Sequence, residues 1–167
     1  NKYYFMNLEE IAKKMCAKGK GILAADESTG TMDKRLKSVN VDCTEKNRLT
    51  FRQTLFGSEA MKNYIGGVIL FDETIKQKTS EGLSIPELII KNEAVPGIKV
   101  DKGAKMLAGS PEETITEGLD GLRDRLKEYY LLGARFTKWR AVYKIGQKYP
   151  SSQWIKSNAQ ALPRYAP

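Results

Sequence analysis

Charged side chains stand at or near the carboxyl ends of three apolar segments of the 167-residue chain. These side chains are Asp26 in the first segment, Lys99 and Asp101 in the second, and Lys138 and Arg140 in the third. In a strand, residues two positions apart face the same way, so each of the two later pairs should share a face. Burying such charges is costly unless they are paired. Together they could hold a phosphate or a developing oxyanion, or they could form an internal salt-bridge cluster without a ligand.

Further hydroxyls and cations lie close to the first of these segments. Ser28 and Thr31 could donate hydrogen bonds to a phosphate, or could make turn bonds only. Lys34 and Arg35 follow the Asp26 loop, and Arg48 lies early in an expected helix. Each cation could reach a phosphate, but spacing alone favours solvated surface charges.

Several kinds of catalytic site are excluded by the residues that the chain carries. It contains no histidine, which removes histidine-based triads and histidine zinc sites from this sequence. The two cysteines, Cys16 and Cys43, form no CxxC pair, so we expect reduced thiols and no metal. Neither a GxGxxG after a strand nor a Walker A pattern is present. We therefore expect no cofactor.

The composition predicts one folded domain over residues 1–167. Hydrophobic residues make up 41% and charged residues 29%, and no linker or repeat interrupts the chain. Lys and Arg number 28 against 20 Asp and Glu, a net charge of +8 that favours anionic partners. Aromatic residues do not interleave with the basic ones, and no apolar run approaches about 20 residues. We therefore expect neither a nucleic acid nor a membrane as partner.

Apolar segments alternate with helical patterns four times along the chain, which predicts parallel βα units. Asn7 and Glu10 form a capping box for the first helix. The residues Ser110, Pro111 and Glu113 are interpreted as a helix start without chemistry. We expect strands at 21–25, 65–71, 96–103 and 135–142, and helices at 8–18, 44–56, 116–132 and from 151 to about 163.

Four parallel strands cannot close an eight-stranded barrel. They would form either a small open α/β domain or the first half of a fold about twice as long.

Five motifs resemble, in the same order, those of the class I fructose-bisphosphate aldolases. They are GKGILAADESTG from Gly19, IGGVILFDET from Ile65, GIKVDKG from Gly97, EGLDGL from Glu117 and GARFTKWRAV from Gly133. The resemblance covers nearly all of the chain and identifies it as the N-terminal half of such a protein. It implies an α/β fold of the TIM (β/α)8 barrel type, of which this chain supplies about the first four βα units.

The resemblance also implies an activity. The family consists of glycolytic lyases that reversibly cleave fructose 1,6-bisphosphate to dihydroxyacetone phosphate and glyceraldehyde 3-phosphate. They do so through a lysine Schiff base, without metal or cofactor. A sugar-phosphate substrate, a homotetramer and a cytoplasmic location are implied in the same way.

Catalytic roles carry over from the family motif by motif. Asp26 resembles the aspartate that assists proton transfer at the substrate C4 hydroxyl and orients the lysines. Lys99 resembles the lysine beside the site. Lys138 resembles the lysine that aids carbinolamine chemistry and lowers the pKa of the nucleophilic amine.

Substrate-binding roles carry over as well. Arg140, Arg35 and Arg48 resemble arginines that contact phosphate in the family. Ser28 belongs to the same loop motif, and Thr31 stands where many members have serine, a change that keeps the hydroxyl.

The sequence departs from the family in one respect. The family's Schiff-base lysine, its acid–base carboxylate and its glycine-rich phosphate site lie on later strands, and no lysine here stands in that motif. We expect this chain to be part of an aldolase, and to be inactive and poorly folded alone because half a barrel leaves open edges.

Two alternatives remain open. One is non-catalytic binding of actin or another acidic protein surface, for which Lys34, Arg35 and Lys37 form a basic cluster. The other is an unrelated phosphate-binding α/β domain.

Overall fold

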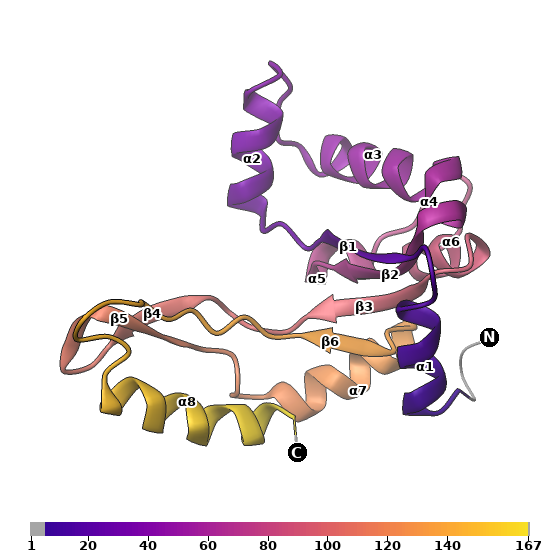
Figure 1. Ribbon diagram of the computed structural model, residues 1–167. Helices are drawn as coiled ribbons and strands as arrows, with labels where there is room; N and C mark the ends of the chain where they lie inside the picture. The colour runs from indigo at the N-terminus through magenta and orange to yellow at the C-terminus, as the bar shows by residue number, and fades with distance from the viewer. Residues whose placement is uncertain (1–5, 167) are drawn as a thin grey trace. The chain divides into compact units, whose positions relative to one another are not determined.

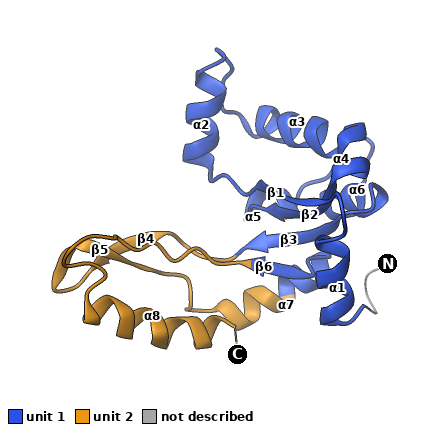
Figure 2. Ribbon diagram, in the orientation of Figure 1, with its two compact units in different colours: residues 1–99, 128–137 blue, residues 100–127, 138–167 orange. Residues whose placement is uncertain are grey.

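The computed structural model describes residues 6–166, which divide into two compact units (Figures 1 and 2). Within the described residues, unit 1 comprises 6–99 and 128–137, and unit 2 comprises 100–127 and 138–166. Each unit is described by itself below.

Unit 1 is built on a parallel sheet with the strand order β1-β2-β3-β6. The strand β1 (Gly21–Ala25) pairs with β2 (Ile65–Leu70), which pairs in parallel with β3 (Val95–Lys99). The last strand is β6 (Phe136–Lys138), whose final residue falls in unit 2. Most residues of β2 and β3 are buried, as expected for strands of a parallel sheet covered on both faces.

Helices join the strands of unit 1 and bury its apolar side chains. Asn7 and Glu10 form the capping box of the first helix, and Ser84 and Glu87 form a second one at the helix that begins at Ile85. The core includes Met32, Phe56, Val68, Ile89 and Ile98, all fully buried. The helices are α1 (Leu8–Met15), α2 (Thr29–Lys37), α3 (Glu45–Phe56), α4 (Glu59–Tyr64), α5 (Asp72–Ile75) and α6 (Ile85–Lys91). The helix α7 (Leu122–Leu132) contributes residues to both units.

Unit 2 contains an antiparallel hairpin of β4 (Ala104–Leu107) and β5 (Ser110–Thr116), with α8 (Ser152–Tyr165) packed on β5. The carboxylate of Glu113, 1% exposed, fixes the start of α8. It accepts hydrogen bonds from the Ser151 main-chain N–H (2.8 Å), the Ser151 hydroxyl and the Ser110 hydroxyl (2.7 Å). The indole of Trp154 donates to the Thr114 carbonyl at 2.8 Å.

Most of the expected elements are present. The strands at 21–25 and 65–70 are confirmed, and so is the helix at 45–56 with Thr44 as its cap. Ser151 caps the last helix, and Pro163 lies inside it. The helices α2, α4, α5 and α6 were not predicted from the sequence.

The expected helix at 116–132 is wrong over its first turns, and so is the expected helix start at Ser110, Pro111 and Glu113. Residues 110–116 form β5 instead. Gly109, at φ 77°, makes the hairpin turn, and Gly118 and Gly121, at φ 130° and 65°, delay the helix until Leu122. The strands expected at 96–103 and 135–142 end early, at Lys99 and Lys138.

The helices of the described part of the chain include none that combines the length and the apolar character needed to cross a bilayer.

The close packing of α1 on β2 can be tested at Gly66. A Cβ at this position would meet the Met15 carbonyl oxygen and lie 2.9 Å from that of Lys14, so α1 would have to move. We expect Gly66→Ala to lower the free energy of unfolding by about 1–3 kcal/mol in urea titrations. Gly21→Ala is the matched control, because nothing lies within 4 Å of its added methyl group. Equal stability of the two variants would contradict the packing described.

Candidate functional site

Two of the predicted catalytic residues lie at one edge of the sheet of unit 1. Asp26 directly follows β1, and Lys99 is the last residue of β3, so both stand at the carboxyl edge of the parallel strands. Both side chains are half-buried. The carboxyl edge of parallel strands is where α/β proteins bind ligands. The sheet therefore brings a carboxylate and an ammonium group to the edge where chemistry is expected.

The other predicted charges, Asp101, Lys138 and Arg140, belong to unit 2. Asp101 is buried, and its carboxylate accepts from the main-chain N–H groups of Gly103 (3.1 Å) and Arg140 (3.3 Å). The Lys138 carbonyl accepts from the Val100 N–H at 3.1 Å. Asp101 thus fixes the main chain at Arg140, whose own side chain is exposed.

The expectation that these charges share strand faces in pairs is wrong. The strand β3 ends at Lys99 and β6 at Lys138, so Asp101 and Arg140 both lie beyond the strands. The alternation of side chains along a strand does not apply to them.

Arg48 is buried, so its interpretation as a solvated surface charge is wrong. Its guanidinium holds Glu73 by two hydrogen bonds, Nε to Oε2 at 2.9 Å and Nη2 to Oε1 at 2.5 Å. Nη1 donates to the Cys43 carbonyl at 2.6 Å. The bond to Glu73 raises the pKa of Arg48, and the same bond lowers the pKa of Glu73.

Arg52 lies one turn further along α3 and is fully buried. Its Nη2 donates to the main-chain oxygen of Glu27 at 2.6 Å. The same guanidinium lies 3.8 Å from Glu27 Oε2 and 3.8 Å from Glu73 Oε2, and 6.0 Å from the centre of the Phe71 ring. Burial lowers the pKa of Arg52, and the two carboxylates oppose that effect.

The remaining predicted ligands lie just before α2, in its first turn or in its last turn. Ser28 precedes the helix, and its hydroxyl is 3.3 Å from that of Thr31. The Arg35 side chain is 58% exposed and forms an ion pair with Glu27. Two hydroxyls and one accessible guanidinium therefore accompany Asp26 in the segment after β1.

Three residues of this region were not predicted from the sequence: Glu27, Arg52 and Glu73. A signal for them was present in α3, where Arg48, Arg52 and Phe56 recur at every fourth position. A helical face that carries both a buried phenylalanine and two arginines must bury cations, and buried cations need carboxylate partners.

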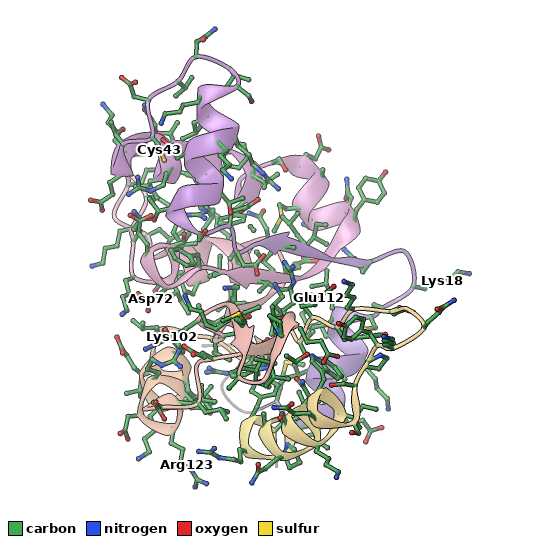
Figure 3. All side chains as sticks on the ribbon, turned by 90° about the vertical axis from the view of Figure 1, so that its left-hand side faces the viewer. Lys18, Cys43, Asp72, Lys102, Glu112 and Arg123 are labelled. Atoms are coloured by element: carbon green, nitrogen blue, oxygen red, sulfur yellow. The ribbon has the colours of Figure 1, made fainter. Side chains whose placement is uncertain are left out.

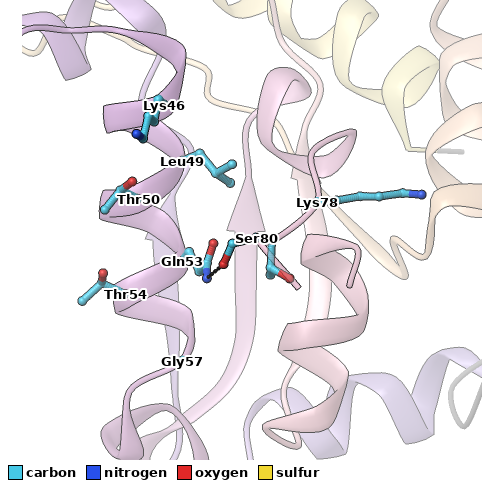
Figure 4. A pocket seen from close by; sticks show the side chains of 9 residues that line it. Lys46, Leu49, Thr50, Gln53, Thr54, Gly57, Lys78 and Ser80 are labelled. Carbon is cyan, nitrogen blue, oxygen red and sulfur yellow. Dashed lines mark hydrogen bonds between the residues drawn. The ribbon is translucent and has the colours of Figure 1, made fainter. Parts of the chain in front are cut away.

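Two cavities lie away from these residues. In unit 1, a hollow of about 480 Å³ runs between α3 and the segment 78–80, where Gln53 and Ser80 point toward each other at 3.4 Å (Figure 4). In unit 2, a hollow of about 370 Å³ is lined by Lys102, Arg164 and residues 116–120. Neither is lined by a predicted site residue, so neither is the candidate site.

Within the described residues, no group of three or more histidine, cysteine, aspartate or glutamate side chains is placed to hold a metal ion. Cys16 and Cys43 are free thiols.

Comparison with known proteins agrees with a parallel α/β fold that carries charged side chains at the carboxyl edge of its sheet. The sequence model of the glycolytic family "Fructose-bisphosphate aldolase class-I" matches residues 7–167. The chain belongs to the class I fructose-bisphosphate aldolase family, which confirms the resemblance found in its motifs.

Individual relatives agree with this assignment. The chain is 55% identical over 159 residues to the "Probable fructose-bisphosphate aldolase class 1" of Xanthomonas campestris pv. campestris, covering 95% of this chain and 48% of the relative. It is 53% identical over 163 residues to the "Fructose-bisphosphate aldolase, cytoplasmic isozyme 1" of Pisum sativum, covering 98% and 46%. The chain spans about half the length of the curated relatives it matches.

A solved structure supports the fold. The fructose-bisphosphate aldolase of Plasmodium falciparum, crystallised with TRAP and a small-molecule inhibitor, matches with a TM-score of 0.89 and 45% identity, over 93% of this chain and 46% of that one. The expected fold class is confirmed. The strands β1, β2, β3 and β6 are the first four of a TIM (β/α)8 barrel.

The ion pair between Arg48 and Glu73 predicts a pH dependence of stability. Arg48 holds the folded-state pKa of Glu73 below its ordinary value of 4.5, so the pair stabilises the protein above that pH. We expect Glu73→Gln to cost about 2 kcal/mol at neutral pH. The difference from wild type should shrink as the pH falls below 4.5 through the lowered pKa, because Glu73 is then protonated in both states.

The measurement is urea unfolding of wild type and variant from pH 7 down to pH 3. Glu59→Gln is the control, since Glu59 is exposed. A pH-independent difference for Glu73→Gln would show that its carboxylate charge is not what stabilises the fold.

Proposed function

We propose that the whole protein carrying this chain is a lyase that reversibly cleaves fructose 1,6-bisphosphate into dihydroxyacetone phosphate and glyceraldehyde 3-phosphate. The observation that carries the proposal is the family match over residues 7–167, which includes the motifs that place Asp26 and Lys99 at the carboxyl edge of the sheet. The reaction would run through a lysine Schiff base. Under this proposal the Schiff-base lysine is supplied by a part of the protein other than this chain.

Each proposed catalytic side chain suits one step of such a reaction. Cleavage between C3 and C4 requires removal of the C4 hydroxyl proton, and a half-buried carboxylate such as Asp26 can accept or relay it. Carbinolamine formation and dehydration build up charge on oxygen, which the ammonium groups of Lys99 and Lys138 would stabilise. A second ammonium group near the nucleophilic lysine also lowers that amine's pKa and keeps it reactive.

The substrate's phosphates would be held by Arg35, Arg140, Ser28 and Thr31, with Arg48 as a further candidate. Arg35 and Arg140 are exposed, so their guanidinium groups are accessible to an anion. Arg48 is already engaged with Glu73, so it would reach a phosphate only by sharing or exchanging that carboxylate. The net charge of +8 favours the approach of an anionic substrate.

We also propose a cytoplasmic location and a homotetrameric assembly for the whole protein. Support for the location comes from relatives named as cytoplasmic or cytosolic isozymes in Pisum sativum and Arabidopsis thaliana. The tetramer is proposed from the family resemblance.

A second candidate function is the binding of an acidic protein surface such as actin. It is favoured by the basic last turn of α2, with Lys34, Arg35 and Lys37, and by exposed cations such as Lys18 and Arg123 (Figure 3). The complex of the Plasmodium falciparum relative with TRAP gives it further support. Salt-sensitive pelleting with actin filaments that substrate does not affect would favour this function, whereas competition by substrate would indicate overlapping sites.

The proposed role of Asp26 predicts a defect in kcat. In the whole protein, Asp26→Asn should lower kcat for cleavage of fructose 1,6-bisphosphate by roughly 10²–10⁴ with little change in KM. Asp33→Asn is the matched control, because Asp33 pairs with Lys37 on the exposed side of α2. If kcat were retained in Asp26→Asn, Asp26 could not be the proton-transfer group.

The Schiff base itself can be trapped. We expect borohydride, added with dihydroxyacetone phosphate, to leave a reduced adduct on the whole protein and none on the isolated chain of 18.8 kDa. Intact mass spectrometry distinguishes the two. An adduct on the isolated chain would contradict the assignment of the nucleophile to another part of the protein, and no adduct on either would overturn the proposed chemistry.

A further inference from the structure

Glu27 lies between two arginines that differ in their exposure to solvent. Its side chain is 9% exposed, and its Oε1 is paired with Arg35 on the outer side. On the inner side, its Oε2 is 3.8 Å from Nη2 of Arg52, which is beyond hydrogen-bond distance. Among the described residues, this buried Oε2 has no hydrogen-bond partner. One oxygen of the carboxylate is therefore paired with Arg35, and the other accepts no hydrogen bond.

The inner arginine is short of acceptors. Arg52 is fully buried, and its Nε and Nη1 also lack hydrogen-bond partners among the described residues. The Arg52 atom nearest to Glu27 Oε2 is Nη2, at 3.8 Å, and one of its two N–H groups donates to the Glu27 main-chain oxygen. A buried acceptor left without a hydrogen bond is unfavourable. A small rotation of the Glu27 carboxylate toward Arg52 would bring Oε2 into hydrogen-bond distance of Nη2, whose second N–H group can donate to it.

The outer arginine has a second possible partner. Arg35 is 58% exposed, and it is one of the proposed phosphate ligands. A phosphate ester carries close to two negative charges and three acceptor oxygens near neutral pH, so it binds a guanidinium more strongly than one carboxylate does. A phosphate that binds Arg35 must therefore displace Glu27 or share Arg35 with it.

We propose that Glu27 is a positioning residue that competes with the substrate phosphate for Arg35 and, once displaced, turns onto Arg52. This proposal rests on the proposed function through the role of Arg35. Glu27 directly follows Asp26, and Arg52 already holds the Glu27 carbonyl at 2.6 Å. Occupancy of the phosphate site thereby tightens the segment that carries the catalytic carboxylate.

The neighbouring carboxylate does not have this freedom. Both oxygens of Glu73 accept hydrogen bonds from Arg48, at 2.5 and 2.9 Å, so Glu73 cannot turn onto Arg52 without losing them. Glu27 is thus the member of the cluster that can exchange partners.

The test measures equilibrium binding of hexitol 1,6-bisphosphate to the whole protein by calorimetry. This probe carries both phosphates and no carbonyl group, so it cannot form a Schiff base. Because Glu27→Gln removes the competing carboxylate, we expect it to bind the probe about fivefold more tightly at 0.15 M salt. Asp33→Asn removes the same charge from α2 without touching Arg35, and should change the affinity by less than about twofold.

A second variant must act in the opposite direction. Arg52→Gln removes the guanidinium that would donate to the displaced carboxylate, so Glu27 stays paired with Arg35 and the probe should bind about fivefold more weakly. In the double variant Glu27→Gln/Arg52→Gln there is no carboxylate to redirect, so the Arg52 substitution should have no further effect on binding. A purely structural role of Arg52 would weaken binding in both backgrounds.

Kinetics provide an independent readout. Glu27→Gln should lower KM for fructose 1,6-bisphosphate and also lower kcat, because the phosphate binds more easily but the Asp26 segment is no longer tightened. Circular dichroism checks that each variant is folded. If Glu27→Gln does not fold, Glu27→Asp keeps a counterion for Arg52 but is too short to span both arginines, and should also tighten binding.

The outcomes separate this inference from the proposed function. Cleavage by wild type, with unchanged or weaker probe binding by a folded Glu27 variant, would overturn the exchange of partners and leave the lyase function standing. An Arg52→Gln effect that persists in the double variant would overturn it as well. Absence of cleavage by wild type would overturn the proposed function, and the exchange with it.

Discussion

The buried guanidinium of Arg52 is the constraint to which the segments around the candidate site must adapt. A cation with no exposed surface is tolerated only where carboxylates and carbonyls surround it. Those groups come from Glu27, after β1, and from Glu73, after β2, while Arg52 itself comes from α3. One charge therefore fixes three segments that are distant in the sequence, at the edge of the sheet where Asp26 stands.

The parallel sheet explains why the charges gather at this edge. The strands β2 and β3 are buried along nearly their whole length, so they cannot carry charges within the sheet. Polar chemistry begins where each strand ends, at Asp26 after β1 and at Lys99 in β3. The buried apolar strands thus fix where the site lies, and the residues at or just beyond their ends supply its reactive groups.

The helices and strands with strong local signals could be predicted from the sequence, and the others could not. GILAA and IGGVIL are short apolar runs of strand type, and the caps at Asn7, Thr44 and Ser151 mark true helix starts. Residues 110–121 differ from the predicted helix because a Ser-Pro-x-Glu sequence resembles a helix cap, whereas Gly109, Gly118 and Gly121, all with positive φ, give a hairpin and a loop. Glu27 and Glu73 were missed because an acidic residue in a loop has the same sequence signature whether it is solvated or paired with a buried arginine.

Three arginines of unit 1, namely Arg35, Arg48 and Arg52, differ in how readily each can bind a phosphate, although nothing in the sequence around them distinguishes them. Arg48 already has a bidentate carboxylate partner and little exposed surface. The free energy of phosphate binding at Arg48 would therefore be reduced by the cost of breaking its bonds to Glu73. Arg52 has no exposed surface at all. Arg35 is mostly exposed and shares its single carboxylate with a second cation, so it gives up that partner at the smallest cost. Of these three, Arg35 is therefore the best suited to bind an incoming phosphate, and the buried Arg48 and Arg52 are suited to hold the loops in place around it.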